Sequence, residues 1–133
     1  MSDSRAGGTG GAETPEALLR ELDPVLNVFA LANGLDLDKD PGDPPARLLG
    51  WYRDGMERFL RLEPETGGGG RFVLWAEARQ RKDGVSRRGR KPVESALSGE
   101  TLKRDLRLVL EKGIEHANRL GPSDLQPGDG NPS

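Results

Sequence analysis

The stretch RFVLWAEARQRKDGVSRRGRK, residues Arg71–Lys91, decides the expected fold. It opens with a continuous run of apolar, β-favouring residues, becomes basic, passes through Asp83-Gly84 and continues basic. Asp-Gly between strand-like residues is a strong signal for a two-residue hairpin, because both residues tolerate the positive φ of a type I′ turn. We therefore predict an antiparallel β-hairpin that reverses at Asp83-Gly84.

A turn at these two residues also fixes the register of the hairpin. Lys82 then faces Val85, and Arg79 faces Arg88. Because side chains alternate between the faces of a strand, a largely charged set shares one face. This set is Glu77, Arg79, Arg81, Ser86, Arg88 and Arg90. The Arg79–Arg88 pair sets like charges across the ladder, which costs up to about 1 kcal/mol. A polyanion lying along that face would relieve the repulsion; the alternative is a solvated hairpin whose arginines point into water.

The charge of the chain is segregated. The formal net charge is −2, yet residues 79–91 hold seven Lys or Arg and one Asp, a local +6, so the remainder sums to −8. Such asymmetry favours a local anion-binding surface over general attraction to anions. The candidate nucleic-acid or anion-binding residues are Arg79, Arg81, Lys82, Arg87, Arg88, Arg90 and Lys91.

Capping signals predict two helical segments before the hairpin. Thr14-Pro15-Glu16 has a capping Thr, a first-turn Pro and an acidic residue, and apolar residues at helical spacing follow over 15–32. Pro24 predicts a kink or a division in this segment. A second cap-and-proline signal, Asp43-Pro44-Pro45, predicts another helix, which ends before Pro64.

A third helix is expected after the hairpin. The return strand is predicted to extend past Pro92 towards Leu97, and Ser98 or Thr101 then caps a helix over about 100–120. Its apolar residues recur at helical spacing, and Gly121-Pro122 follows as a stop signal.

The expected fold is therefore α+β: two N-terminal helical segments, one antiparallel β-hairpin with a basic distal part and one C-terminal helix, in the order α-α-β-β-α. A single domain is expected over 14–121. Residues 1–13 and 122–133 lack apolar periodicity and are expected to be disordered tails. Because a lone two-stranded sheet is marginal in water, either the helices cover its apolar base or a second copy extends it, and a homodimer is the favoured expectation.

Signatures of catalysis and metal binding are sparse. The chain has no cysteine and one histidine, which excludes thiolate chemistry, disulfides and cysteine-based zinc sites. Asp36, Asp38 and Asp40 have the spacing of a calcium loop, but Pro41 and Arg47 stand where the loop needs Gly and a bidentate Glu. We interpret residues 34–43 as a solvated connector. No catalytic residue, metal or cofactor is predicted, and an enzyme is the less favoured interpretation.

The sequence offers no segment for a membrane. No apolar run approaches the roughly 20 residues that a spanning helix needs. The first 13 residues have no apolar core of a signal peptide, and the absence of cysteine fits a reducing compartment. A cytoplasmic location without membrane contact is therefore expected.

Two short resemblances bear on function. Arg88-Gly89-Arg90 resembles the Arg-Gly-Arg centre of an AT-hook. The expected order of helices, a basic hairpin containing Arg87–Pro92 and a final helix is similar to that of HU-type architectural proteins. Both resemblances imply that a cationic arm binds the DNA minor groove.

Two functions are compatible with these patterns. The first is a small non-enzymatic nucleic-acid-binding protein, for DNA or RNA, whose basic hairpin contacts phosphates with little sequence specificity. The second is a homodimeric interaction or assembly adaptor whose hairpin engages an acidic protein. The acidic remainder of the chain favours the second, because it would repel a polyanion.

Overall fold

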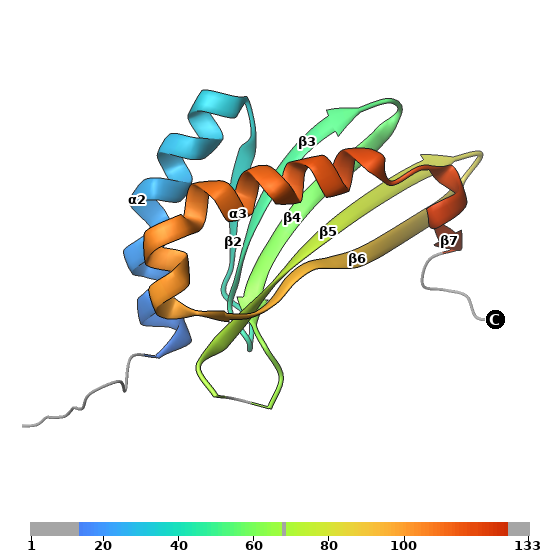
Figure 1. The fold of residues 1–133 in the computed structure, drawn as a ribbon. Helices are drawn as coiled ribbons and strands as arrows, with labels where there is room; N and C mark the ends of the chain where they lie inside the picture. Colours follow the sequence, from blue (N-terminus) through green and yellow to red (C-terminus); the bar gives the residue numbers. More distant parts are fainter. Residues whose placement is uncertain (1–13, 68, 128–133) are drawn as a thin grey trace, which may run out of the picture.

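A computed structural model describes residues 14–67 and 69–127 of the chain. Within these ranges α2 (Pro15–Asn33) and α3 (Gly99–Arg119) pack on one face of a six-stranded antiparallel sheet, whose order follows the sequence (Figure 1). The strands are β2 (Asp36–Asp40), β3 (Ala46–Arg53), β4 (Met56–Pro64), β5 (Arg71–Lys82), β6 (Val85–Ser98) and β7 (Gln126–Pro127). Within the described residues no α-helix covers the opposite face of the sheet, which we call the open face.

The predicted order α-α-β-β-α is wrong. The region expected to be a second helix is the β3–β4 hairpin, which reverses at Asp54 and Gly55 with φ of 55° and 78°. The connector expected over 34–43 contains β2, which pairs with β3 at the edge of the sheet. The similarity to HU-type proteins depended on the predicted order of elements, so it is wrong as well.

Two inward-facing arginines explain why the sequence pattern predicts a helix where the structure has β3 and β4. Arg47 on β3 and Arg58 on β4 occupy positions that face the helices, and both are buried. Each breaks the apolar–polar alternation that predicts a strand. The other apolar residues of this region recur at a spacing close to that of a helix.

The β5–β6 hairpin has the predicted turn and register. Asp83 and Gly84 have φ of 55° and 76°. Lys82 pairs with Val85 and Arg79 with Arg88, as expected. The hairpin is more than an isolated ribbon, because β4 pairs with β5 along its base. On the side of β5 that faces the helices, the buried residues include small ones such as Ala76 and Ala78.

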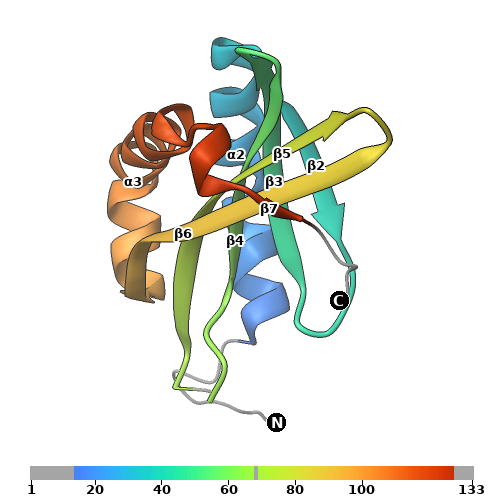
Figure 2. The ribbon, with the colours of Figure 1, turned by 90° about the vertical axis from the view of Figure 1, so that its right-hand side faces the viewer.

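The helices begin at their predicted caps. Thr14 accepts a hydrogen bond from the Ala17 N–H at 3.1 Å, and Ser98 accepts one from the Thr101 N–H at 3.0 Å. α2 continues through Pro24 as one helix and ends at Gly34, which has a left-handed φ of 67°. The hydrophobic core lies between these helices and the sheet (Figure 2).

The chain after α3 returns to the sheet. A 3-10 turn, η1 (Pro122–Asp124), leads into β7, which pairs with Arg87 and Arg88 of β6. The remainder of the expected tails, residues 1–13 and 128–133, lies outside the described residues. A homodimer was expected because an isolated hairpin needs another strand beside it. In the structure β4 of the same chain pairs with β5, so the hairpin does not need a second copy for this purpose.

A buried ion pair joins α2 to β3. Arg47 Nε and Nη2 donate to the two Asp23 carboxylate oxygens at 2.8 and 3.2 Å, and Lys39 Nζ lies 3.3 Å from Oδ2. Burial alone would raise the pKa of Asp23, but hydrogen bonds and positive charge from Arg47 and Lys39 outweigh it and hold that pKa below its ordinary value. The pair therefore stabilises the fold only while Asp23 is ionised.

A second buried guanidinium joins β4 to the end of α3. The Arg58 residue is 1% exposed, and its Nη1 donates to the carbonyls of Ala117 at 2.6 Å and Leu120 at 2.8 Å. Its Nε donates to the Arg53 carbonyl at 3.1 Å, beside the β3–β4 turn. Burial lowers the pKa of Arg58, but an arginine stays charged at neutral pH. The cation thus satisfies carbonyls at the negative end of the helix dipole.

Replacing Arg58 with Met should destabilise the protein strongly. The substitution leaves the Leu120 carbonyl without its Arg58 donor, leaves the Ala117 carbonyl with the Leu120 N–H alone and removes the bond to the Arg53 carbonyl, so the free energy of unfolding should fall by about 3 kcal/mol. Urea unfolding followed by circular dichroism measures the change. The exposed Arg53 provides the control, since Arg53→Met should change stability by less than about 0.5 kcal/mol. Equal effects of the two substitutions would contradict the role of Arg58.

The Asp23–Arg47 pair predicts a pH dependence of stability. Because the folded-state pKa of Asp23 is lowered, its contribution is complete above the unfolded pKa of about 3.9 and is lost as the pH falls through the folded value. Asp23→Asn should therefore cost about 3 kcal/mol at pH 7, and the difference from the wild type should shrink below pH 4. Urea unfolding of both proteins between pH 7 and pH 3 tests this. A difference that stays constant across the range would rule out the ion pair as its source.

Candidate nucleic-acid interface

The candidate interface lies on the open face of the sheet. Strand alternation directs every second side chain of β3 to β6 away from the helices, and these positions carry mostly charged and aromatic residues. A hollow of about 620 Å³ runs over the middle of this face. Its side-chain lining includes Leu48, Phe59, Arg61, Glu63, Glu77, Arg79, Arg88 and Arg90.

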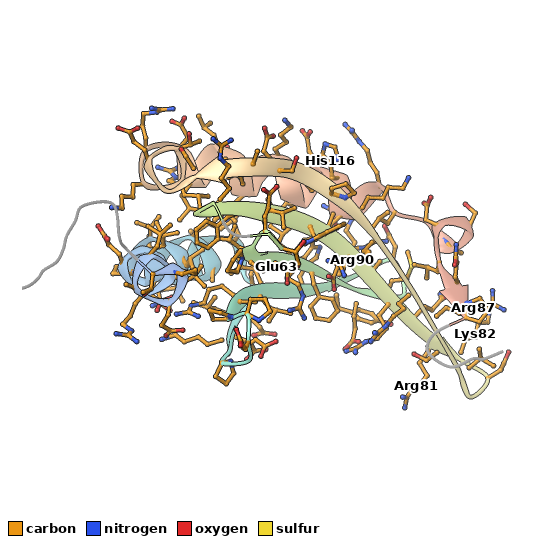
Figure 3. All side chains as sticks on the ribbon, turned by 90° about the horizontal axis from the view of Figure 1, so that it is seen from below. Glu63, Arg81, Lys82, Arg87, Arg90 and His116 are labelled. Carbon is orange, nitrogen blue, oxygen red and sulfur yellow. The ribbon has the colours of Figure 1, made fainter. Side chains whose placement is uncertain are left out.

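The middle of the open face neutralises its own charge. Arg61 Nε lies 3.4 Å from Glu77 Oε2, and Arg90 lies 3.6 Å from Glu63 and 3.7 Å from Glu77. The Arg90 guanidinium also covers the ring of Trp75, 3.7 Å from its centroid. Figure 3 shows Glu63 and Arg90 close together over the centre of the sheet. Arg90 is therefore committed to the protein's own groups.

Arg79 is engaged in the same way, one step nearer the turn. Its Nε donates to Glu57 Oε1 at 2.8 Å, and its guanidinium lies 5.3 Å from the centroid of the Phe59 ring. These contacts draw Arg79 towards β4 and away from the Arg88 opposite. The repulsion expected between the two arginines is relieved within the chain.

Lys91 also has a partner. Its Nζ lies 3.5 Å from Asp124 Oδ1, in η1. A hydrogen bond from the Gly121 N–H, with the Lys91 charge as a smaller contribution, lowers the pKa of Asp124 below its ordinary value. The ion pair helps to hold η1 beside β6.

The remaining four candidates lie towards the tip of the ribbon, and we call them the distal cations. They are Arg81, Lys82, Arg87 and Arg88. None of them forms an ion pair or a side-chain hydrogen bond within residues 14–67 and 69–127. The predicted set is thus divided: Arg79, Arg90 and Lys91 are bound by carboxylates, and the distal cations are available.

The distal cations point to both faces of the ribbon. Arg81 and Arg88 share the open face with Arg79, whereas Lys82 and Arg87 alternate to the side of the helices. Figure 3 places Arg81, Lys82 and Arg87 at the far end of the ribbon, with Arg81 on the opposite side from Arg87. Positive charge therefore surrounds the end of the hairpin.

The AT-hook-like segment is held within the sheet. Arg88-Gly89-Arg90 pairs with β5 throughout, and Arg88 also pairs with β7. A Cβ on Gly89 would collide with the Asp124 carbonyl, because η1 crosses directly over it. The segment is therefore a paired strand and cannot enter a minor groove as a free extended peptide.

Sequence reasoning missed the contribution of the β3–β4 hairpin. Beside the distal cations lies a second hollow of about 640 Å³, lined by Tyr52, Gly55, Glu57, Arg79, Arg81, Ser86 and Arg88. Tyr52 was assigned to a helix, whereas it lies on β3 with 71% of its surface exposed. The Asp54-Gly55 pair carried the same turn signal as Asp83-Gly84 and could have revealed this hairpin.

Other kinds of site find no support in the described ranges. No group of three or more His, Asp or Glu side chains there is arranged to hold a metal ion. Of the aspartates of β2, Asp40 is engaged by the protein itself, since its Oδ2 lies 3.5 Å from Arg61 Nη1. Within the same ranges no helix is both long enough and apolar enough to span a membrane.

Comparison with known proteins finds one kind of relative. The chain is 33% identical over 125 residues to two curated sequences named polyribonucleotide nucleotidyltransferase, both from Thermus thermophilus. The match covers 81% of this chain but 17% of each relative, so the chain spans about a sixth of their length. No family model matches the chain, and no solved structure matches it either.

Proposed function

We propose that this protein binds nucleic acid, without catalysis, through the distal end of the β5–β6 hairpin. The observation that carries the proposal is the set of distal cations, which project from both faces of the paired β5–β6 ribbon. Guanidinium groups present several donors in a fixed plane and suit phosphate oxygens. Contacts confined to phosphates carry little sequence information, so binding should be weakly specific.

The distribution of carboxylates supports the same surface. The ion pairs over the middle of the sheet would repel or exclude a phosphate chain, because Glu63 and Glu77 lie among the arginines there. Towards the tip, Arg81 and Arg88 have no ion pair within the described residues, while Glu57, which lines the same hollow, is paired with Arg79. A polyanion would therefore cross the end of the hairpin.

The comparison adds independent support. The name of the Thermus thermophilus relatives refers to polyribonucleotides, and the similarity extends over most of this chain. This supports RNA as the first nucleic acid to test, with DNA beside it. The relatives' whole activity is not carried over, since the match covers 17% of their length.

An acidic protein segment is the second candidate partner. The observation that favours it is the charge of −8 outside residues 79–91, which would weaken attraction to a long polyanion. A short acidic segment could reach the same guanidinium groups while avoiding the rest of the surface. Binding to polyglutamate under the conditions used for nucleic acid separates the two.

Removing the open-face distal cations should weaken binding. Arg81→Ala/Arg88→Ala should reduce affinity for a single-stranded oligoribonucleotide at least about tenfold at low salt, because two phosphate contacts are lost. The slope of log K against log salt should become shallower by about 1.4, from the roughly 0.7 per contact of single strands. Fluorescence anisotropy of a labelled oligonucleotide measures both.

The matched control removes the same charge from the other side of the molecule. Arg104 and Arg107 lie exposed on α3, away from the open face, so Arg104→Ala/Arg107→Ala should leave affinity within about twofold. Circular dichroism checks the fold of both variants. Equal losses in the two variants would show general charge attraction, and no measurable binding by the wild type at low salt would end the proposal.

Releasing Arg79 should strengthen binding. Glu57→Gln removes the carboxylate that holds Arg79 at 2.8 Å, so one more guanidinium becomes available to phosphate and affinity should rise about threefold or more. Glu16→Gln on α2 is the control, because Glu16 is also exposed and paired with an arginine, Arg20. Anisotropy that shows no gain for Glu57→Gln, or the same gain for both, would contradict phosphate binding at this position.

A further inference from the structure

The hollow beside the distal cations has one feature that phosphate contacts do not use, the exposed ring of Tyr52. The neighbouring Trp51 alternates to the helix side, where its Nε1 donates to Asn118 Oδ1 on α3 at 2.9 Å. Tyr52 therefore faces away from the core, on the same side as Arg79 and Arg81. An exposed aromatic ring at the wall of a groove offers a ligand an apolar face beside a polar hydroxyl group.

Register places Tyr52 in a row with the arginines. Tyr52 pairs with Glu57 across β3 and β4, Glu57 with Arg79 across β4 and β5, and Arg79 with Arg88 across β5 and β6. Adjacent strands are about 4.8 Å apart, so the row from Tyr52 to Arg88 spans roughly 14 Å. A hollow of about 640 Å³ beside this row is within the size range of small-molecule sites, which suits a base with its sugar.

The rings on the open face differ in their availability. The ring of Phe59 lies under Arg79, and that of Trp75 lies under Arg90. Within residues 14–67 and 69–127, no cation–π contact covers the ring of Tyr52. Tyr52 is therefore the open-face aromatic that can stack against a planar ligand.

We propose that this groove binds a single-stranded segment of nucleic acid, with a base stacked on Tyr52 and the adjoining phosphates on Arg81 and Arg88. The inference rests on the proposed function and specifies its substrate. In a duplex the faces of the bases are stacked on one another, so only an unpaired base can offer its face to Tyr52. Stacking on an aromatic ring accepts every base, which agrees with phosphate contacts that carry no sequence information.

Glu57 fits the same arrangement. It lies in the row between Tyr52 and Arg79, and its carboxylate is paired with Arg79 at 2.8 Å. The ion pair leaves no free cation for a phosphate at that point, whereas an uncharged base needs none. The carboxylate therefore directs the base to the Tyr52 side and the phosphates to the β5–β6 side.

The test compares Tyr52→Ala with Tyr52→Phe against oligonucleotides of one sequence, as single-stranded RNA, single-stranded DNA and duplex. Loss of base stacking should reduce the affinity of Tyr52→Ala for both single strands about fivefold or more, while the duplex affinity stays within twofold. Tyr52→Phe keeps the ring and should bind like the wild type. Circular dichroism checks that the variants remain folded, as exposure of Tyr52 predicts.

The outcomes separate the inference from the proposed function. If Tyr52→Ala binds single strands like the wild type while Arg81→Ala/Arg88→Ala does not, the stacking site is wrong and phosphate binding stands. If Tyr52→Ala weakens duplex and single strands equally, the preference for unpaired bases is wrong. If neither variant changes the affinity, both proposals fail. A loss on RNA alone would confine the inference to RNA, because the groove would then depend on the ribose.

Discussion

Arg58 is a full positive charge enclosed between the sheet and the end of a helix. Its Nη1 donates hydrogen bonds to the carbonyls of Ala117 and Leu120, and its Nε donates one to the carbonyl of Arg53. One side chain of β4 therefore binds both the C-terminus of α3 and the strand end beside the β3–β4 turn. Because η1 and β7 continue from that terminus, their position along β6 also depends on this contact. The distal half of the molecule is organised around a buried cation.

On the open face, the neighbouring carboxylates determine whether an arginine is held in an ion pair or is available to an external anion. Over the middle of the sheet, Arg61 and Arg90 are interleaved with Glu63 and Glu77, and such pairs limit attraction to an external anion. Towards the turn, Arg81 and Arg88 have no ion-pair partner within the described residues, and their charge faces solvent. The same residue type thus stabilises the sheet at one end and is available to a partner at the other.

The sequence predicted those parts of the fold that depend on local signals. The Asp83-Gly84 turn, the Arg79–Arg88 register and the Thr14 and Ser98 caps follow from backbone preferences of a few adjacent residues. Asp54-Gly55 signalled the β3–β4 turn, but apolar periodicity does not reveal its strands, because Arg47 and Arg58 face inward and bind partners far away in the sequence. A periodicity argument assumes that inward positions are apolar, and long-range ion pairs and hydrogen bonds break that assumption. The cationic half of the candidate site was therefore predicted, and its aromatic half on β3 was not.

The proposed site for nucleic acid is the distal end of the open face, between the two Asp-Gly turns. Amide chemical shifts of the isotope-labelled protein, titrated with a single-stranded oligoribonucleotide, test this residue by residue. The account predicts that the shifts concentrate in residues 52–57 and 79–88 and leave α2 and β2 unchanged. Shifts centred on α2 and β2, or no shifts at high oligonucleotide concentration and low salt, would contradict it.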